Sequence, residues 1–149
     1  MAERADGYAD QVERSLLDSS SYQLIRALAR YKAIVAGGLD RYGLHLGQEF
    51  YLAQLWCEDG VTSADLASRT GVSAPAVTKV VTGLERAGLV HRERDSSDAR
   101  LVRVWLTEAG RALREPVSRL WYESEAAFWG GLTDGERARV RAAIGDLLG

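Results

Sequence analysis

The sequence contains few of the residues on which most catalytic and metal sites depend. It has one cysteine, Cys57, and two histidines, His45 and His91, among 149 residues. One cysteine forms neither an internal disulfide nor a metal cluster, and neither histidine has a ligand partner at a helical spacing. No phosphate-binding glycine loop or nucleophile elbow is present. We therefore expect no enzyme, no metal site and no cofactor, and we expect Cys57 to be a buried free thiol.

Long apolar runs and an overall positive charge are also missing. No stretch of about 18 apolar residues could span a membrane, and the polar N-terminus MAERADGYAD does not resemble a secretory signal. We expect a cytoplasmic protein with no membrane partner. The net charge is −2, but residues 60–106 hold seven basic and five acidic residues, so the remainder carries −4. This uneven distribution favours a DNA-binding surface within residues 60–106.

The segment from Thr62 to Leu84 has the pattern of two short helices joined by a tight turn. Thr62 is a good N-cap with Asp65 three residues later, and Gly71 suits a sharp turn. Ser73 then caps a second helix that has Pro75 in its first turn. The apolar residues of that helix lie at i, i+3, i+4 and i+7, on one buried face: Val77, Val80, Val81 and Leu84. The pattern is that of a helix-turn-helix, although a plain helical hairpin produces it too.

The opposite face of the second helix carries short, polar or cationic side chains that fit a DNA groove. These candidate DNA contacts are Ser73, Pro75, Ala76, Thr78, Lys79 and Thr82. Ser73 and Thr78 can hydrogen-bond to phosphates or bases, and Pro75 and Ala76 can touch thymine methyl groups. We expect this helix to enter the major groove.

Residues 90–106 alternate in polarity with period two on both sides of a polar loop, which predicts a β-hairpin. A basic hairpin directly after a helix-turn-helix is the wing of a winged helix, and this one contains Arg92, Arg94, Arg100 and Arg103. Asp98 lies two residues before Arg100, so it can orient that guanidinium toward a minor groove. Arg94, Asp98 and Arg100 are therefore further candidates for the DNA interface. The alternative is an ordinary solvated hairpin.

At this point the sequence resembles the MarR (multiple antibiotic resistance regulator) family of bacterial transcription factors. Five motifs carry the resemblance: G-L-x-x-x-Q at 43–48, the helix pair at 62–84, L-E-R-A-G-L-V at 84–90, D-S-S-D-A-R at 95–100 and L-T-E-A-G at 106–110. The resemblance implies a mainly α fold with a small β-hairpin wing. It also implies one MarR-type domain over residues 1–149, with a winged helix-turn-helix at 47–106 and dimerisation helices at 20–46 and 107–149.

Apolar periodicity outside the winged region predicts four further helices. We expect them over residues 20–42, 47–58 and 107–129, and after a capping box at residues 133–136. Pro116 should kink the third or remove one hydrogen bond, and Phe50 should be mostly buried in the second. The outer helices hold more apolar surface than a small winged domain covers, so we expect a homodimer on a near-palindromic operator.

The resemblance also implies a ligand pocket where the dimerisation helices meet the winged domain. The candidate residues are Tyr22, Arg26, Tyr31, Trp56 and Trp121. Aromatic rings beside a buried cation would suit a small aromatic acid, although core packing and surface arginines explain the same residues. The predicted function is a sequence-specific, double-stranded-DNA-binding repressor released by a small molecule. The alternative is a winged helix that contacts proteins and has no DNA role.

Overall fold

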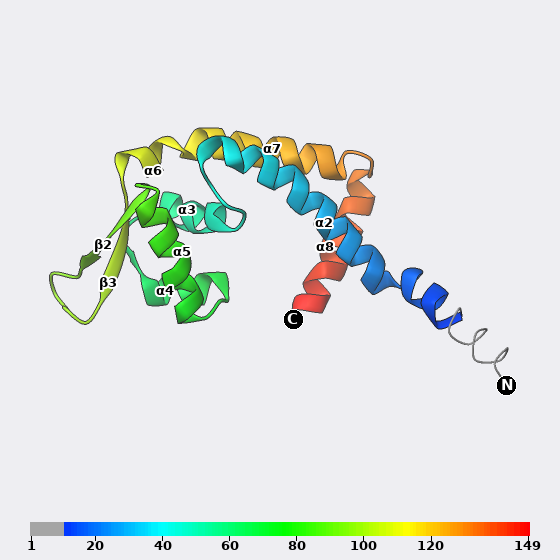
Figure 1. Cartoon of the computed structure of the whole chain (residues 1–149), viewed down its shortest axis with the longest axis horizontal. Coiled ribbons are helices and arrows are strands. Elements are labelled where there is room, and N and C mark those ends of the chain that lie inside the picture. Colours follow the sequence, from blue (N-terminus) through cyan, green and yellow to red (C-terminus); the bar gives the residue numbers. More distant parts are fainter. Residues whose placement is uncertain (1–10) are drawn as a thin grey trace. The chain divides into compact units, whose positions relative to one another are not determined.

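The computed structural model describes residues 11–149, so residues 1–10 of the predicted single domain lie outside the described part. After a helical segment at residues 11–17, the helices are α2 (Ser20–Leu39), η1 (Asp40–Tyr42), α3 (Gln48–Cys57), α4 (Ser63–Thr70), α5 (Ala74–Arg86), α6 (Glu108–Ala112), α7 (Arg114–Trp129) and α8 (Asp134–Leu148). The strands are β1 (Val61–Thr62), β2 (Val90–Arg94) and β3 (Val102–Leu106) (Figure 1). The predicted fold class, mainly α with a β-hairpin wing, is confirmed.

The chain divides into two compact units, one ending at Ile34 and the other running from Val35 to Gly149. The described part of the first unit is helical. The predicted apolar face of the first long helix runs from Leu24 to Leu39; in this unit Leu24, Ile25 and Leu28 are exposed in the single chain and Tyr31 is half-buried. The part of α2 before Val35 therefore carries apolar side chains that the single chain leaves exposed.

The core of the second unit lies among α3, α4, α5 and the sheet. Val77, Val81 and Leu84 of α5 are buried there, as predicted. Val80 is half-buried, which leaves three of the four predicted core positions fully covered. The prediction for Phe50 is wrong, because its ring is 48% exposed at the start of α3. Apolar residues occur on most sides of α3, so the sequence does not show which face of this helix is buried.

Local hydrogen bonds set the ends of α4 and α5 where the sequence predicts them. The Thr62 hydroxyl accepts from the Asp65 N–H at 3.0 Å, and the Asp65 carboxylate accepts from the Thr62 N–H at 3.3 Å. Gly71 ends α4 with φ +68°, a conformation that favours glycine. Ser73 caps α5 by accepting from the Ala76 N–H at 3.4 Å. The turn that orients α5 is thus encoded within about ten residues.

The sheet has three antiparallel strands in the order β1-β3-β2, one more than the predicted hairpin. Val90 pairs with Leu106 and Arg94 pairs with Val102, so the hairpin register follows the predicted alternation. Strand β1 adds Val61 opposite Val104. A two-residue strand has no period to detect, which is why the sequence did not reveal it.

The predicted helix over residues 107–129 is divided at Leu113 into α6 and α7. The cause is Pro116, which has no N–H for the Ala112 carbonyl and whose ring clashes with that carbonyl in a straight helix. Gly110 of α6 packs closely, since a Cβ there would lie 2.1 Å from the Leu89 carbonyl oxygen. The glycine of the L-T-E-A-G motif therefore brings α6 against the turn that precedes the wing.

Two further sequence expectations concern the surface. Cys57 is exposed, so the prediction of a buried thiol is wrong. Cys57 is the last residue of α3 and lies past the buried residues of that helix. The capping box of Thr133 and Glu136 opens α8 as predicted, yet α8 has no buried residue in the single chain. Within the described residues, no helix is long and apolar enough to cross a membrane.

Candidate nucleic-acid interface

Helix α5 presents its predicted DNA-contacting residues mainly to solvent. Ser73, Pro75, Thr78 and Lys79 are exposed, and Ala76 and Thr82 are half-buried. The Thr78 hydroxyl donates to the Ala74 carbonyl at 3.0 Å, which leaves its lone pairs free to accept. The Ser73 hydroxyl accepts its capping hydrogen bond, so its own proton remains available to an outside acceptor.

Lys79 is the cation at the centre of this exposed face. Within the part of the chain that the structure describes, Lys79 forms no ion pair, whereas the arginines of the hairpin have partners. Its ammonium group is therefore available for a phosphate or a base edge.

The predicted residues of α5 divide between two sides of the helix. Ala76, Lys79 and Thr82 line a groove of about 1070 Å³ between α5 and α3, whose α3 side includes Gln48 and Tyr51. Ser73, Pro75 and Thr78 do not line it. The structure thus places all six residues on α5 or its cap without giving them one common surface.

A network of hydrogen bonds around Asp95 connects the two sides of the wing loop. The Asp95 carboxylate accepts from the backbone N–H groups of Ser97 at 2.8 Å and Asp98 at 2.9 Å, and from the Arg103 guanidinium. Hydrogen bonding by Arg103, followed by the two backbone groups, lowers the pKa of Asp95 to about 2. Arg103 also donates to the Gly60 carbonyl at 2.8 Å, which connects the wing to the turn before β1.

The predicted pair of Asp98 and Arg100 is present at the loop end. The Arg100 Nε and Nη2 donate to the two Asp98 oxygens at 2.9 and 2.8 Å, a bidentate geometry. These bonds lower the pKa of Asp98 and raise that of Arg100. The Arg100 side chain is nevertheless 89% exposed, so its charge remains accessible to a partner.

The other two hairpin arginines differ in role. Arg92 donates to Glu85 of α5, with Nη2 2.7 Å from Oε2, and thereby connects the wing to α5. Arg94 donates to the Ala99 carbonyl at 2.9 Å across the loop and remains exposed. The sequence pattern predicts a hairpin with four cationic residues. It missed that Arg92 and Arg103 are bound by carboxylates, since those partners depend on how the hairpin folds back.

The predicted ligand residues fall into both compact units. Tyr22, Arg26 and Tyr31 belong to the first, where the Arg26 guanidinium carbon lies 5.9 Å from the centre of the Tyr22 ring. Arg26 is exposed in the single chain. Trp56 and Trp121 belong to the second unit and line one cavity of about 230 Å³ between α3 and α7.

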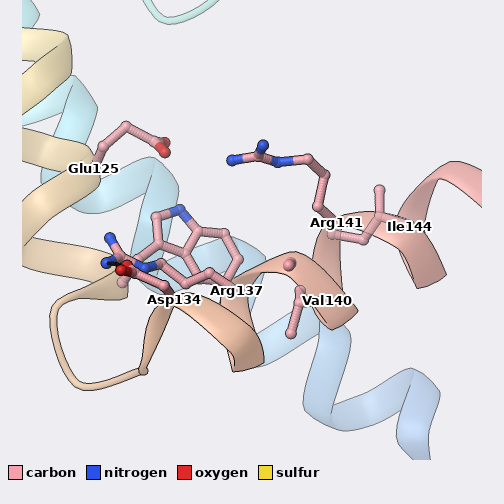
Figure 2. A pocket seen from close by; sticks show the side chains of 8 residues that line it. Glu125, Asp134, Arg137, Val140, Arg141 and Ile144 are labelled. Carbon is pink, nitrogen blue, oxygen red and sulfur yellow. Dashed lines mark hydrogen bonds and ion pairs between the residues drawn. The ribbon is translucent and has the colours of Figure 1, made fainter.

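A separate hollow of about 500 Å³ lies between the end of α7 and α8. Figure 2 shows Glu125 of α7 and Arg141 of α8 pointing toward one another across it. Arg137 pairs with Asp134 at 2.5 Å beside it, and Val140 and Ile144 supply apolar surface. This hollow lies outside the helix-turn-helix and contains none of the predicted site residues.

Comparison with known proteins relates this chain to one protein family. The MarR family profile matches residues 44–102. The transcriptional regulator AdcR of Streptococcus pneumoniae is 35% identical over 92 residues, which cover 62% of this chain and 62% of AdcR. The chain thus spans less than two thirds of that relative. The transcriptional repressor Rv2887 of Mycobacterium tuberculosis is 32% identical over 126 residues, which cover 85% of this chain and 91% of Rv2887.

Solved structures agree with the sequence comparison. The crystal structure of the S. aureus MepR–DNA complex superposes with a TM-score of 0.80 at 25% identity, covering 87% of this chain and 96% of that one. Because the winged helix-turn-helix, its Asp98–Arg100 loop and these relatives agree, the chain belongs to the MarR family.

Proposed function

We propose that this protein is a transcriptional repressor that binds a specific double-stranded DNA sequence with α5 in the major groove. The observation that carries the proposal is the set of exposed polar side chains and the exposed Lys79 on α5, a helix that Glu85 and Arg92 connect to the wing. A cationic helix face and a cationic wing at one end of a small domain fit the groove and the backbone of DNA together. The structural relative MepR, which was crystallised as a complex with DNA, supports the same assignment.

The wing supplies the second contact in this proposal. Arg100 is held by Asp98 in one orientation and is largely exposed, so its guanidinium is prepared for a narrow minor groove. Arg94 is the candidate for a backbone phosphate. In this proposal, residues 47–106 form the DNA-binding region.

We further propose that the repressor is a homodimer assembled through residues 20–46 and 107–149. The support is the uncovered apolar surface of α8, where Leu147 is 77% and Leu148 81% exposed, together with the exposed leucines of α2. A symmetric dimer would place two copies of α5 about 34 Å apart and would select a near-palindromic operator. A small-molecule effector would release the DNA.

The proposal is tested by fluorescence anisotropy with a labelled duplex from upstream of the protein's own gene. Thr78→Ala and Lys79→Ala should each weaken specific binding by about 1–3 kcal/mol if the residue contacts a base. Arg139→Ala is the control, because Arg139 is an exposed cation outside residues 47–106, on the side of α8 away from its exposed apolar residues. It should leave the affinity unchanged.

Two outcomes would count against the proposal. Unchanged affinity in both α5 variants would remove α5 from the interface. Absence of any saturable, salt-sensitive binding to the duplex would favour the alternative function, a winged helix that contacts proteins.

A further inference from the structure

The turn formed by Asp59 and Gly60, between α3 and β1, is hydrogen-bonded to distant parts of the chain. The Asp59 Oδ1 accepts from the Leu106 N–H at 2.8 Å, across 47 residues, and from the Gly60 N–H at 3.0 Å. Its Oδ2 accepts from the Arg111 Nη2 at 2.8 Å, across 52 residues. One carboxylate therefore binds the end of β3 and helix α6 at the same time.

The bond from Leu106 takes the place of a pairing that strand β1 does not make. Strand β1 pairs Val61 with Val104 and ends its register with β3 there. The Leu106 N–H lies two residues past Val104, and the Asp59 carboxylate accepts it. Hydrogen bonds to an ionised group are stronger than neutral ones, and this carboxylate is only 24% exposed. The base of the wing is thus held by a side chain of the turn.

Gly60 extends this connection toward the wing loop. Its carbonyl accepts from the Arg103 Nη1 at 2.8 Å, and Arg103 also donates to Asp95 within the loop. Gly60 has φ +72°, and a Cβ there would lie 2.3 Å from the Trp105 ring, so the turn packs directly on β3. Contiguous hydrogen bonds therefore lead from α6 through the turn to the loop that carries Arg100.

We propose that Asp59 is a positioning residue for the wing: it fixes the base of β3 against α6, so that Arg100 reaches DNA in a set position. The inference rests on the DNA-binding function proposed above, and it gives Asp59 no contact with DNA. Helix α6 leads directly into α7, so the same carboxylate connects the wing to the proposed dimerisation region. Hydrogen bonds in a row carry coupling only if both ends respond together, which a double-mutant cycle measures.

Operator binding by Asp59→Ala, measured by fluorescence anisotropy over a salt series, tests the positioning role. We expect the affinity to fall about 5-fold or more, although the variant removes a negative charge that DNA would repel. The slope of log K against log salt should flatten by about one contact, as in Arg100→Ala. In the double variant, Arg100→Ala should change the slope by less than about half a contact further. Tighter binding by Asp59→Ala, or a full additive effect of Arg100→Ala, would overturn the inference.

Two further variants separate positioning from the loss of a charge or of stability. Glu58→Ala removes the neighbouring carboxylate, which pairs with Arg69 of α4, and it should keep the full effect of Arg100→Ala. Loss of that effect in Glu58→Ala too would refute a specific role for Asp59. Arg111→Ala removes only the α6 contact, at a side chain that is 58% exposed, and it should reduce the effect of Arg100→Ala. If Asp59→Ala does not fold, a full Arg100→Ala effect in the Arg111→Ala background refutes the inference.

Amide hydrogen exchange of the DNA-free chain separates the failure of this inference from the failure of the proposed function. In Asp59→Ala the N–H groups of Ser97 and Asp98 should exchange about 3-fold faster or more, because Arg103 loses a fixed carbonyl partner. Faster exchange at Leu106 alone would show a local role and contradict the inference. A chain with coupled exchange that binds no operator would refute the repressor and leave the connection between turn and wing standing. Operator binding without coupled exchange would refute only the positioning role.

Discussion

Helices α5 and α8 both begin at a side-chain cap, but their apolar side chains have different surroundings. In α5 the face is covered by its own domain, with Val77, Val81 and Leu84 at most 1% exposed. In α8 the corresponding face includes Ile144 at 39% and Leu147 at 77% exposure. An apolar stripe therefore predicts that a helix face will be buried, but it does not show whether the same chain or a second chain buries it.

The difference separates the tasks of the two helices. Because α5 is held by the core and by the Glu85–Arg92 pair, its opposite face can be presented rigidly. Helix α8 is locally stable through its capping box but has little holding it in place within the single chain. We expect substitutions in the α5 core to change folding and substitutions on α8 to change association.

The largest expected effect concerns association. Leu147→Asp should weaken the homodimer by about 3–6 kcal/mol, because a symmetric dimer loses two buried leucines. Sedimentation velocity over a dilution series measures this change. Ala142→Asp is the control, since Ala142 is exposed on the opposite side of α8 and should have little effect. A wild-type chain that sediments as a monomer at micromolar concentration would refute the dimer.

A smaller effect is expected for folding. Leu84→Ala should lower the free energy of unfolding by about 2–5 kcal/mol, because Leu84 is fully buried on the inner face of α5. Urea denaturation monitored by circular dichroism measures it. Leu148→Ala, at an 81% exposed position, should cost far less at protein concentrations where the chain is monomeric. Equal losses in the two variants would contradict the distinction between the helices.

Substitution of a wing arginine should change the salt dependence of DNA binding by about one charge. Arg100→Ala should flatten the slope of log K against log salt by about one contact, since it removes one cation from the proposed interface. Asp98→Ala should also weaken DNA binding, because Arg100 loses its bidentate partner. Long-range repulsion alone predicts tighter binding for Asp98→Ala, and that result would refute the oriented arginine. Arg139→Ala, an exposed cation on α8, is the control.

The smallest expected effect is on stability at low pH, through the titration of the Asp95 carboxyl group. The folded pKa of Asp95, about 2, lies below its ordinary value of 3.8. Its stabilising contribution is therefore complete above pH 3.8 and is lost as the pH falls toward 2. Carboxyl NMR should follow Asp95 with a midpoint near 2, and in Arg103→Ala the midpoint should move up toward 3.8. An unmoved midpoint would show that Arg103 is not the main cause.

The ends of α4 and α5, the hairpin register and the pairing of Asp98 with Arg100 were all predicted, and they depend on groups a few residues apart. The DNA and ligand roles assigned from these residues stay predictions. Strand β1, the carboxylate partners of Arg92 and Arg103, and the exposure of Phe50 and Cys57 were not predicted.

The sequence by itself determined the caps, the turn at Gly71, the break before Pro116 and the alternating strands, because each is decided by backbone hydrogen bonds or steric clashes between near neighbours. Only the tertiary structure decided which hairpin arginines lack a carboxylate partner and which buried carboxyl group has an oxygen without a hydrogen-bond partner among the described residues. Arg103 reaches Gly60 across 43 residues, and Glu49 shares a cavity with Trp121 of a distant helix. Burial and charge pairing of that kind arise from packing between elements, which local pattern does not specify.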